Sequence, residues 1–316
     1  MEFKEIHITE YDSFFNDTDW LFLKASYYLT NTPKENIHNL KCFIGSFNET
    51  NIGIIGLLEN EEFTSPYRAP FGGFRTLNTS FSYNKMQLFY KELEKVLQNY
   101  GCKKIVISLP PLEYNQDFVS KQITCLNNSD FELINSELNQ FFDLHKFNDN
   151  LNYLSVTEKQ KTRYVLKKKL THELVIDSKQ KEEVYDLIKN SRLIRDIPLK
   201  LSWPQLRHIT MNINADYWLV KTPNNENCAS AVIYHINPEI VLIVYWGFDP
   251  KHYKLDSMRY LSYEIFKYYH SKDKKLVDIG ISTENSIANT GLINFKESVG
   301  CDSCLRIEMS KKLIIS

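Results

Sequence analysis

The stretch Cys228–Phe248, "CASAVIYHINPEIVLIVYWGF", consists of two apolar runs rich in β-branched and aromatic residues, with a Pro-Glu pair between them. Runs of this kind, joined by so short a connection, are typical of paired antiparallel strands. We therefore expect a hairpin at the centre of a sheet in the second half of the chain.

Outward from this hairpin, the second half alternates between strand and helix patterns. Period-2 and buried apolar runs predict strands, and apolar residues at helical spacing predict helices, several of which begin at a capping residue such as Ser178. The predicted order around the hairpin is strand 172–177, helices 178–194 and 202–213, strand 216–221, the hairpin, helix 254–271, strand 274–280, helix 286–300 and strand 304–315.

The first half follows a similar course of helices and strands. The predicted elements are a helix at 19–29, a hairpin formed by 40–47 and 51–60, a helix at 82–101, a strand at 103–111, a further helix, and one or two strands within 131–145. A polar segment leading into a strongly basic helix begins at Lys146, so we expect two domains, 1–148 and 149–316.

The overall composition is that of an ordinary globular protein. The chain has 316 residues, a formal net charge of -1, 43% hydrophobic and 24% charged residues. Without a basic excess we expect no binding of duplex nucleic acid. Neither an apolar signal region nor an apolar run of ~20 residues is visible, which predicts a cytoplasmic location and no membrane span.

Known catalytic and metal-binding motifs are missing. Cys301 and Cys304 are two residues apart, but no second ligand pair accompanies them, so we expect free thiols and no metal site. The sequence also lacks a Ser-His-Asp order, a GxGxxG motif and a GxxxxGK motif, which argues against a hydrolase, a dehydrogenase or a nucleotide kinase.

The second-half order, a central hairpin followed by a strand-helix-strand unit, resembles the acyl-CoA N-acyltransferase (GNAT) fold. Three motifs, "KTRYVLKKKL" (161–170), "LVDIGIS" (276–282) and "NTGLINFKESVG" (289–300), resemble the Fem-type branch of that superfamily. The stretch "SPYRAPFGGF" (65–74) is similar to one in relatives encoded with bacterial surface-polysaccharide genes. The resemblance implies an α+β fold with two GNAT-like domains, each a mostly antiparallel mixed sheet flanked by helices.

The same resemblance implies an N-acyltransferase with no permanently bound cofactor. The donor would be acyl-CoA, acyl carrier protein or aminoacyl-tRNA, and the acceptor an amine on a cell-envelope or nucleotide-sugar precursor. In the GNAT fold the loop after the fourth strand offers backbone N–H groups to the donor pyrophosphate. Here that loop is Gly247–Met258, which lacks the (Arg/Gln)-x-x-Gly-x-(Gly/Ala) signature of acetyl-CoA users. The alternative for this loop is a plain strand-to-helix connection. The alternative for the protein is a non-catalytic scaffold that binds a glycan precursor or a partner protein.

Site residues follow from the motifs. Lys296 matches a functional lysine of the Fem motif and would neutralise phosphate or stabilise an oxyanion; alternatively its stem packs on Phe295 and its ammonium is solvated. Asp278 would act as a weak base or orient the amine, or else cap a turn. The expected donor-binding residues are Trp246, Gly247, Phe248, Asn289, Gly291 and Phe295.

Acceptor binding is expected at three places. In the 65–74 loop, glycines permit close approach of a ligand and the other residues supply stacking and charge, although an aromatic-packed turn explains them equally. On the basic helix, Arg163 and Lys167 are four residues apart and share one face, which could bind phosphates of a nucleotide-linked acceptor. The alternative is that this face is simply solvated. The expected acceptor-binding residues are Arg68, Phe71, Gly72, Gly73, Arg163, Lys167 and Tyr245.

Overall fold

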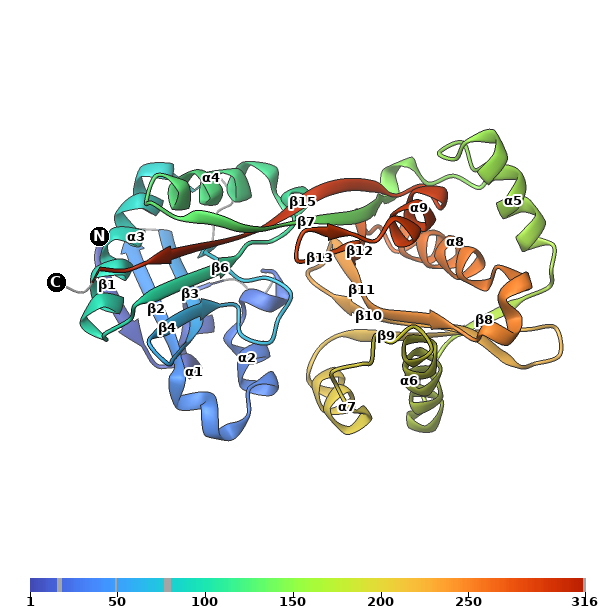
Figure 1. Cartoon of the computed structure of the whole chain (residues 1–316), viewed down its shortest axis with the longest axis horizontal. Helices are drawn as coiled ribbons and strands as arrows, with labels where there is room; N and C mark the ends of the chain where they lie inside the picture. The colour runs from blue at the N-terminus through green and yellow to red at the C-terminus, as the bar shows by residue number, and fades with distance from the viewer. Residues whose placement is uncertain (16–18, 49, 77–80, 315–316) are drawn as a thin grey trace. The chain divides into compact units, whose positions relative to one another are not determined.

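A computed structural model describes residues 1–15, 19–48, 50–76 and 81–314 (Figure 1). The chain forms two compact units. Unit 1 comprises 1–138, 283–287 and 304–316, and unit 2 comprises 139–282 and 288–303. The expected boundary at 148/149 therefore lies inside unit 2, because two long strands, β7 (Glu132–Asp143) and β15 (Asp302–Lys312), each contribute residues to both units.

Unit 1 is built on a mixed sheet with the strand order β1-β2-β3-β4-β6-β15 and with β5 paired to β3. The predicted hairpin is present as β2 and β3. The pair β4 and β6 is parallel, and the pairs β1–β2, β2–β3, β3–β4, β3–β5 and β6–β15 are antiparallel. The strands are β1 (Glu2–Ile6), β2 (Leu40–Phe47), β3 (Thr50–Glu59), β4 (Glu62–Ser65), β5 (Arg75–Thr76) and β6 (Lys104–Ser108).

Helices cover both faces of the unit 1 sheet (Figure 1). Two strand positions one register step apart show this directly. A Cβ added at Gly45, which pairs with Ile52, would meet Phe89 of α3, and one added at Gly53, which pairs with Ile44, would meet Tyr11 of α1. The helices are α1 (Ile8–Tyr11), α2 (Ala25–Asn31), α3 (Tyr83–Asn99) and α4 (Gln116–Asn127), with 3-10 turns η1 (Asp12–Phe14), η2 (Leu21–Leu23), η3 (Lys34–Asn39) and η4 (Leu112–Tyr114).

The predicted helix 19–29 is wrong in one respect, since it is broken at Lys24. That residue is extended, with φ -89° and ψ 136°, and separates η2 from α2. The carboxylate of Asp12 accepts hydrogen bonds from the backbone N–H groups of Ala25 and Ser26 at 2.9 and 3.0 Å. A distant aspartate therefore caps the first turn of α2 and fixes its start.

Unit 2 has the strand order β7-β12-β11-β10-β9-β8. The hairpin that opened the sequence is present as β10 and β11, which pair antiparallel. In unit 2, α6 and α7 cover one face of the sheet and α5, α8 and α9 the other (Figure 1). The remaining strands are β8 (Thr171–Leu174), β9 (Ala215–Lys221), β10 (Asn227–His235), β11 (Ile240–Phe248) and β12 (Leu276–Ile281), and a short ladder, β13 (Thr283–Glu284) with β14 (Ile287–Ala288), follows β12 in the chain.

The helices of unit 2 agree with the predicted order, and the predicted basic helix is α5. They are α5 (Val156–Leu166), α6 (Ser178–Leu193), α7 (Trp203–Asn212), α8 (Ser257–His270) and α9 (Thr290–Ser298), with 3-10 turns η5 (Leu144–Lys146) and η6 (Pro250–Leu255).

Strands β11 and β12 pair in parallel over only three positions, from Ile240 opposite Leu276 to Leu242 opposite Asp278. Beyond Leu242, β11 continues to Phe248 paired with β10 alone among the described strands, and the pairing register shifts at a bulge opposite Val232 and Ile233. A bulge adds a residue to one strand and bends it. The sheet therefore opens between the ends of β11 and β12.

Within the described residues, no helix combines the length and apolar character needed to cross a membrane.

Candidate functional site

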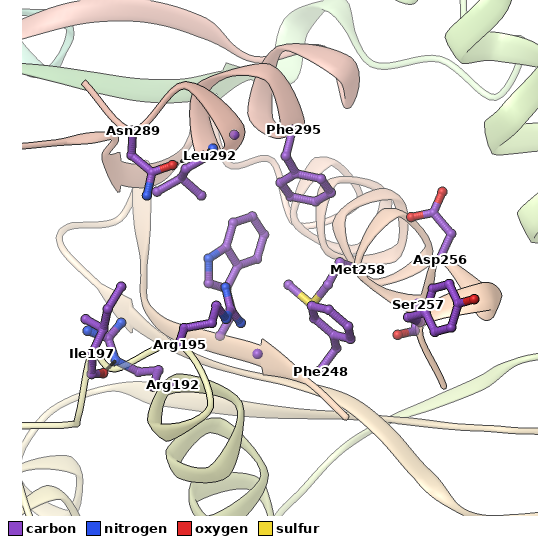
Figure 2. Close-up of a pocket in the computed structure, with 14 residues that line it drawn as sticks. Arg192, Arg195, Ile197, Phe248, Asp256, Ser257, Met258, Asn289, Leu292 and Phe295 are labelled. Atoms are coloured by element: carbon purple, nitrogen blue, oxygen red, sulfur yellow. Dashed lines mark hydrogen bonds between the residues drawn. The ribbon is translucent and has the colours of Figure 1, made fainter. Parts of the chain in front are cut away.

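A cavity of about 510 Å³ lies in unit 2 at the end of β11 (Figure 2). It is bounded by the end of β11, the first turn of α8, the first two turns of α9 and the segment that follows α6. The six residues expected to bind the donor all line it. The full lining is Arg192, Arg195, Ile197, Trp246, Gly247, Phe248, Tyr253, Asp256, Ser257, Met258, Asn289, Gly291, Leu292 and Phe295.

The end of β11 forms one wall. The backbone N–H of Phe248 donates to Ser191 Oγ at 3.1 Å, which ties the strand to α6. A Cβ at Gly247 would lie 2.7 Å from the Cβ of Ser191, so glycine is required for this close approach. The rings of Trp246 and Phe295 meet edge to face, with centroids 5.7 Å apart, and join β11 to α9.

The first turn of α8 forms a second wall. Asp256 precedes it in a left-handed conformation, with φ 52°, and its Oδ2 accepts from Arg259 Nε at 2.9 Å. Arg259 is only 6% exposed; it also forms an ion pair with Glu158, and its Nη1 donates to the backbone oxygen of Ser298 at 2.9 Å. The charge of Asp256 is thereby offset, and the first N–H groups of α8, which have no intrahelical acceptor, can attract an anion.

Helix α9 forms the roof. Asn289 accepts a hydrogen bond from the backbone N–H of Leu292 at 3.0 Å and so caps the helix, while its own N–H donates to Ser282 O at 2.9 Å. Gly291 is exposed at the cavity, and the nearest described atom to an added Cβ, apart from its chain neighbours and the backbone of α9, would be Asn289 Oδ1 at 3.7 Å.

Lys296, on α9, lies elsewhere than expected. It is 1% exposed and absent from the cavity lining, and its Nζ donates to the carbonyl oxygens of Gly280 at 2.7 Å and Ile281 at 3.0 Å. Burial lowers the pKa of Lys296 to about 8, although the nearby Asp278 and Cys301 oppose the shift. Its ammonium faces neither cavity nor solvent, because the end of β12 offers it two backbone acceptors.

Asp278 belongs to the same buried cluster. It is 2% exposed, and its Oδ1 accepts from Asn139 Nδ2 at 2.9 Å and from the backbone N–H of Gly280 at 2.7 Å. Gly280 has φ +74°, a conformation that favours glycine. Asp278 and Lys296 therefore hold the backbone N–H and the backbone carbonyl of one residue, Gly280, near the end of β12.

The 65–74 loop lies in unit 1 and is largely closed by its own packing. Phe71 is 1% exposed and meets Phe22 and Tyr114 edge to face, at 5.1 and 5.2 Å. A Cβ at Gly72 would lie 2.6 Å from Ser65 Oγ, and one at Gly73 would lie 2.7 Å from Gln122 Oε1. These glycines admit protein atoms, and Arg68 is the exposed member of the four residues expected to bind the acceptor there.

The remaining expected acceptor residues are dispersed in unit 2. Arg163 on α5 and Lys167 at its C-cap are exposed and do not line the cavity. Tyr245 precedes the cavity wall on β11, and burial raises its pKa while Arg192 opposes the rise. No group of three His, Cys, Asp or Glu side chains that could hold a metal occurs in residues 1–15, 19–48, 50–76 and 81–314.

The sequence reasoning missed the two cavity arginines, Arg192 and Arg195. They end α6 and begin the segment after it, and their i, i+3 spacing was the available signal. It was not distinctive, because basic residues in the last turn of a helix are common and stabilise it without any ligand.

No protein-family model and no curated protein sequence matches the chain. Solved structures do match over nearly all of it. A structure described as FemX has a TM-score of 0.70 with 13% identity and covers 99% of this chain and 98% of its own. L-PGS from Bacillus licheniformis has a TM-score of 0.57 with 11% identity, covering 92% and 91%. A tandem GNAT protein from the clavulanic acid biosynthesis pathway has a TM-score of 0.51 with 8% identity, covering 98% of both chains. The chain has a Fem-like tandem GNAT fold, which confirms the predicted resemblance at the level of the fold.

Proposed function

We propose that this protein is an N-acyltransferase that moves an acyl or aminoacyl group from a carrier to an amine, with the donor bound in the unit 2 cavity. One observation carries the proposal: in a tandem GNAT fold, the cavity lies where β11 leaves β12 and where α8 begins. In that fold, this is where the carrier's phosphates are expected to bind. Acyl-CoA, acyl carrier protein and aminoacyl-tRNA are the candidate donors, each as a co-substrate.

The cavity wall suits such a donor in two ways. The first turn of α8, at Ser257 and Met258, presents backbone N–H groups to phosphate. Trp246, Phe248 and Phe295 provide apolar surface against which a carrier arm or an acyl group can pack and from which water is displaced.

Catalysis in this proposal depends mainly on holding the acyl carbon and the amine together and on stabilising the oxyanion. Lys296 and Asp278 contribute by holding the backbone carbonyl and the backbone N–H of Gly280 near the end of β12. As positioned, neither reaches the cavity, so direct contact with the oxyanion requires the ammonium to leave its two carbonyls. Lys296→Ala is expected to lower the rate of transfer without changing donor affinity.

A donor titration tests the proposal. Acetyl-CoA, a long acyl-CoA, acyl carrier protein and charged tRNA are each titrated into the wild type, Trp246→Ala and the matched control Trp203→Ala, whose side chain does not line the cavity. One donor should bind saturably, and Trp246→Ala alone should weaken it. Charged tRNA binding should weaken steeply with salt, whereas binding of a small donor should change much less.

The alternative is a non-catalytic scaffold that binds a glycan precursor or a partner protein. It is favoured by one feature, the lack of the glycine-rich pyrophosphate signature in Gly247–Met258. A scaffold predicts no saturable binding of any of the four donors, so the same titration separates the two functions.

The acceptor proposed is an amine on a cell-envelope precursor or a nucleotide-linked amino sugar. FemX and L-PGS, among the similar folds, support a cell-envelope setting as a hypothesis. Mass spectrometry of reactions that combine the bound donor with nucleotide-linked amino sugars and envelope precursors would detect an acylated product.

A further inference from the structure

We propose that the unit 2 cavity contains a second anion-binding subsite, formed by Arg192 and Arg195, which holds a carboxylate or phosphate group of the acceptor. The inference rests on the proposed function, because that function assigns the α8 end of the same cavity to the donor.

The two ends of the cavity are separated by apolar side chains. Figure 2 shows Arg192 and Arg195 on one side and Ser257, in the first turn of α8, on the other, with Phe248 and Met258 between them. A donor and an acceptor that each carry an anionic group could bind at opposite ends, with their apolar parts meeting in the middle. That arrangement would bring an acyl group and an amine together.

Arg195 is held in place by α6 itself. Its Nε donates to Ser191 O at 3.0 Å and its Nη2 to Ser191 Oγ at 2.6 Å. The same Oγ accepts from the backbone N–H of Phe248, and the guanidinium lies 5.6 Å from the centroid of that ring. The arginine is therefore fixed against the end of β11, which lowers the entropy lost when it binds a ligand.

The two Nη groups of Arg192 are available to bind a ligand. Its Nε donates to Ile197 O at 3.1 Å, and neither Nη nitrogen has a hydrogen-bond partner among the residues that the structure describes. Two parallel N–H groups on a planar guanidinium match the two oxygens of a carboxylate or a phosphate. The bond to Ile197 orients the guanidinium without using its Nη groups.

The charge of the cavity favours an anion at this end. Asp256, the acidic residue among the fourteen that line the cavity, is paired with Arg259. Neither Arg192 nor Arg195 forms an ion pair within the described part of the chain. Burial and the charge of Arg192 together lower the pKa of Arg195. An anion bound between the two guanidinium groups would relieve this repulsion.

The competing explanation is that the arginines only stabilise the C-terminal end of α6 through the helix dipole. In that case their removal would lower stability and leave ligand binding unchanged. The two explanations therefore differ in a binding measurement.

The test uses pairs of small probes that differ by the anion alone. Ligand-observed NMR titrations compare phenylalanine with phenylalaninamide for a carboxylate, and glucosamine 6-phosphate with glucosamine for a phosphate. The proteins are the full-length wild type, Arg192→Met, Arg195→Met and a control, Arg207→Met, which removes an exposed arginine of α7 outside the cavity.

In the wild type, at least one anionic probe should bind about 10-fold or more tightly than its partner, as expected for hydrogen bonds to a charged group. Arg192→Met and Arg195→Met should remove that preference, and Arg207→Met should keep it. The pair that shows the preference identifies the anion as carboxylate or phosphate. Equal binding of both members of both pairs to the wild type, or a preference that survives in Arg192→Met, would overturn the proposal.

Two further measurements keep the test decisive. Thermal unfolding of each variant establishes that it is folded. Where Arg192→Met is unstable, Arg192→Lys replaces it, because lysine keeps the positive charge but lacks the two parallel N–H groups. The preference for the anionic probe should also be lower in Arg192→Lys. Coenzyme A is titrated into the same samples. If coenzyme A fails to bind while the arginine-dependent preference persists, a CoA-linked donor is excluded and the anion subsite is still supported.

Discussion

Two stretches have similar compositions but differ in packing: residues 65–74 in unit 1 are packed against protein atoms, and residues 245–258 in unit 2 border a cavity. Both contain glycine, proline and several aromatic residues. The first is closed: the N–H of Gly72 donates to Ser108 O at 2.8 Å, that of Gly73 to Ser65 Oγ at 3.2 Å, and that of Phe74 to Gln122 Oε1 at 2.8 Å. The second borders the 510 Å³ cavity.

The difference comes from the neighbours of each stretch. In unit 1, the space around Phe71 is occupied by Phe22, Tyr114 and Trp20. In unit 2, β11 loses β12 as a partner after Leu242, so the side chains at its end have an unfilled space on one side. Composition indicates where a ligand could bind, but strand pairing determines whether room for it exists. The following predictions compare the two stretches, from the largest expected effect to the smallest.

The largest effect is expected at the two phenylalanines. Phe71→Ala should lower the free energy of unfolding by about 3–5 kcal/mol, because it leaves a cavity in a filled core. Phe248→Ala should cost less than about 2 kcal/mol, since its ring is only partly buried beside a cavity. Urea unfolding followed by circular dichroism measures both; similar costs would contradict the contrast.

The second prediction concerns the pH dependence of stability that follows from the buried ammonium of Lys296. The folded pKa of Lys296, about 8, lies below its ordinary value of 10.5, so the unfolded chain binds more protons between these two pH values. The contribution of Lys296 should therefore rise from pH 8 to pH 10.5, by about 1.4 kcal/mol per pH unit at most and roughly 3 kcal/mol in total.

Lys296→Met separates the contribution of Lys296 to the pH dependence from the contributions of the other titrating groups. The difference in free energy of unfolding between wild type and Lys296→Met should grow in favour of the wild type across that pH window, and stay constant below about pH 7. Parallel curves for the two proteins would show that the ammonium is solvated, contrary to its bonds with Gly280 and Ile281.

The glycines give a smaller contrast. Gly72→Ala should cost about 1–3 kcal/mol, because the new Cβ would lie 2.6 Å from Ser65 Oγ and 2.7 Å from the backbone nitrogen of Pro66. Thermal unfolding at one pH measures the cost. A neutral result would mean that the 65–74 loop has room to move.

The smallest effect is expected at Gly291. Gly291→Ala should be neutral or stabilise the protein by about 0.5 kcal/mol, because α9 gains helix propensity and the nearest described atom to the Cβ, apart from its chain neighbours and the backbone of α9, would be Asn289 Oδ1 at 3.7 Å. Destabilisation comparable to that of Gly72→Ala would indicate that the cavity mouth is packed after all.

The order of elements was predictable because its signals are local. Apolar residues of α3 such as Met86, Phe89, Leu93 and Leu97 recur at helical spacing and are all buried, and the Cys228–Phe248 hairpin is bounded by a recognisable turn. The break at Lys24 was not predictable, since its cap comes from Asp12 on another element.

The site was predictable in part for the same reason. The residues at the end of β11 and the start of α9 were identified from motifs, and they line one cavity. The burial of Lys296 depends on carbonyls that only the folded chain supplies, and the role of Arg195 depends on Ser191. Neither partner is marked as such in the sequence.

The central claim, that unit 2 holds the donor site and the 65–74 loop does not, is tested most directly by one affinity measurement. Acetyl-CoA, a long acyl-CoA, acyl carrier protein and charged tRNA are titrated into wild type, Phe248→Ala and Phe71→Leu, the last a mild change that preserves the core of unit 1. We predict that a donor binds the wild type saturably, that Phe248→Ala weakens it about 10-fold or more, and that Phe71→Leu does not. Absence of saturable binding for all four donors, or unchanged affinity in Phe248→Ala, would contradict the claim.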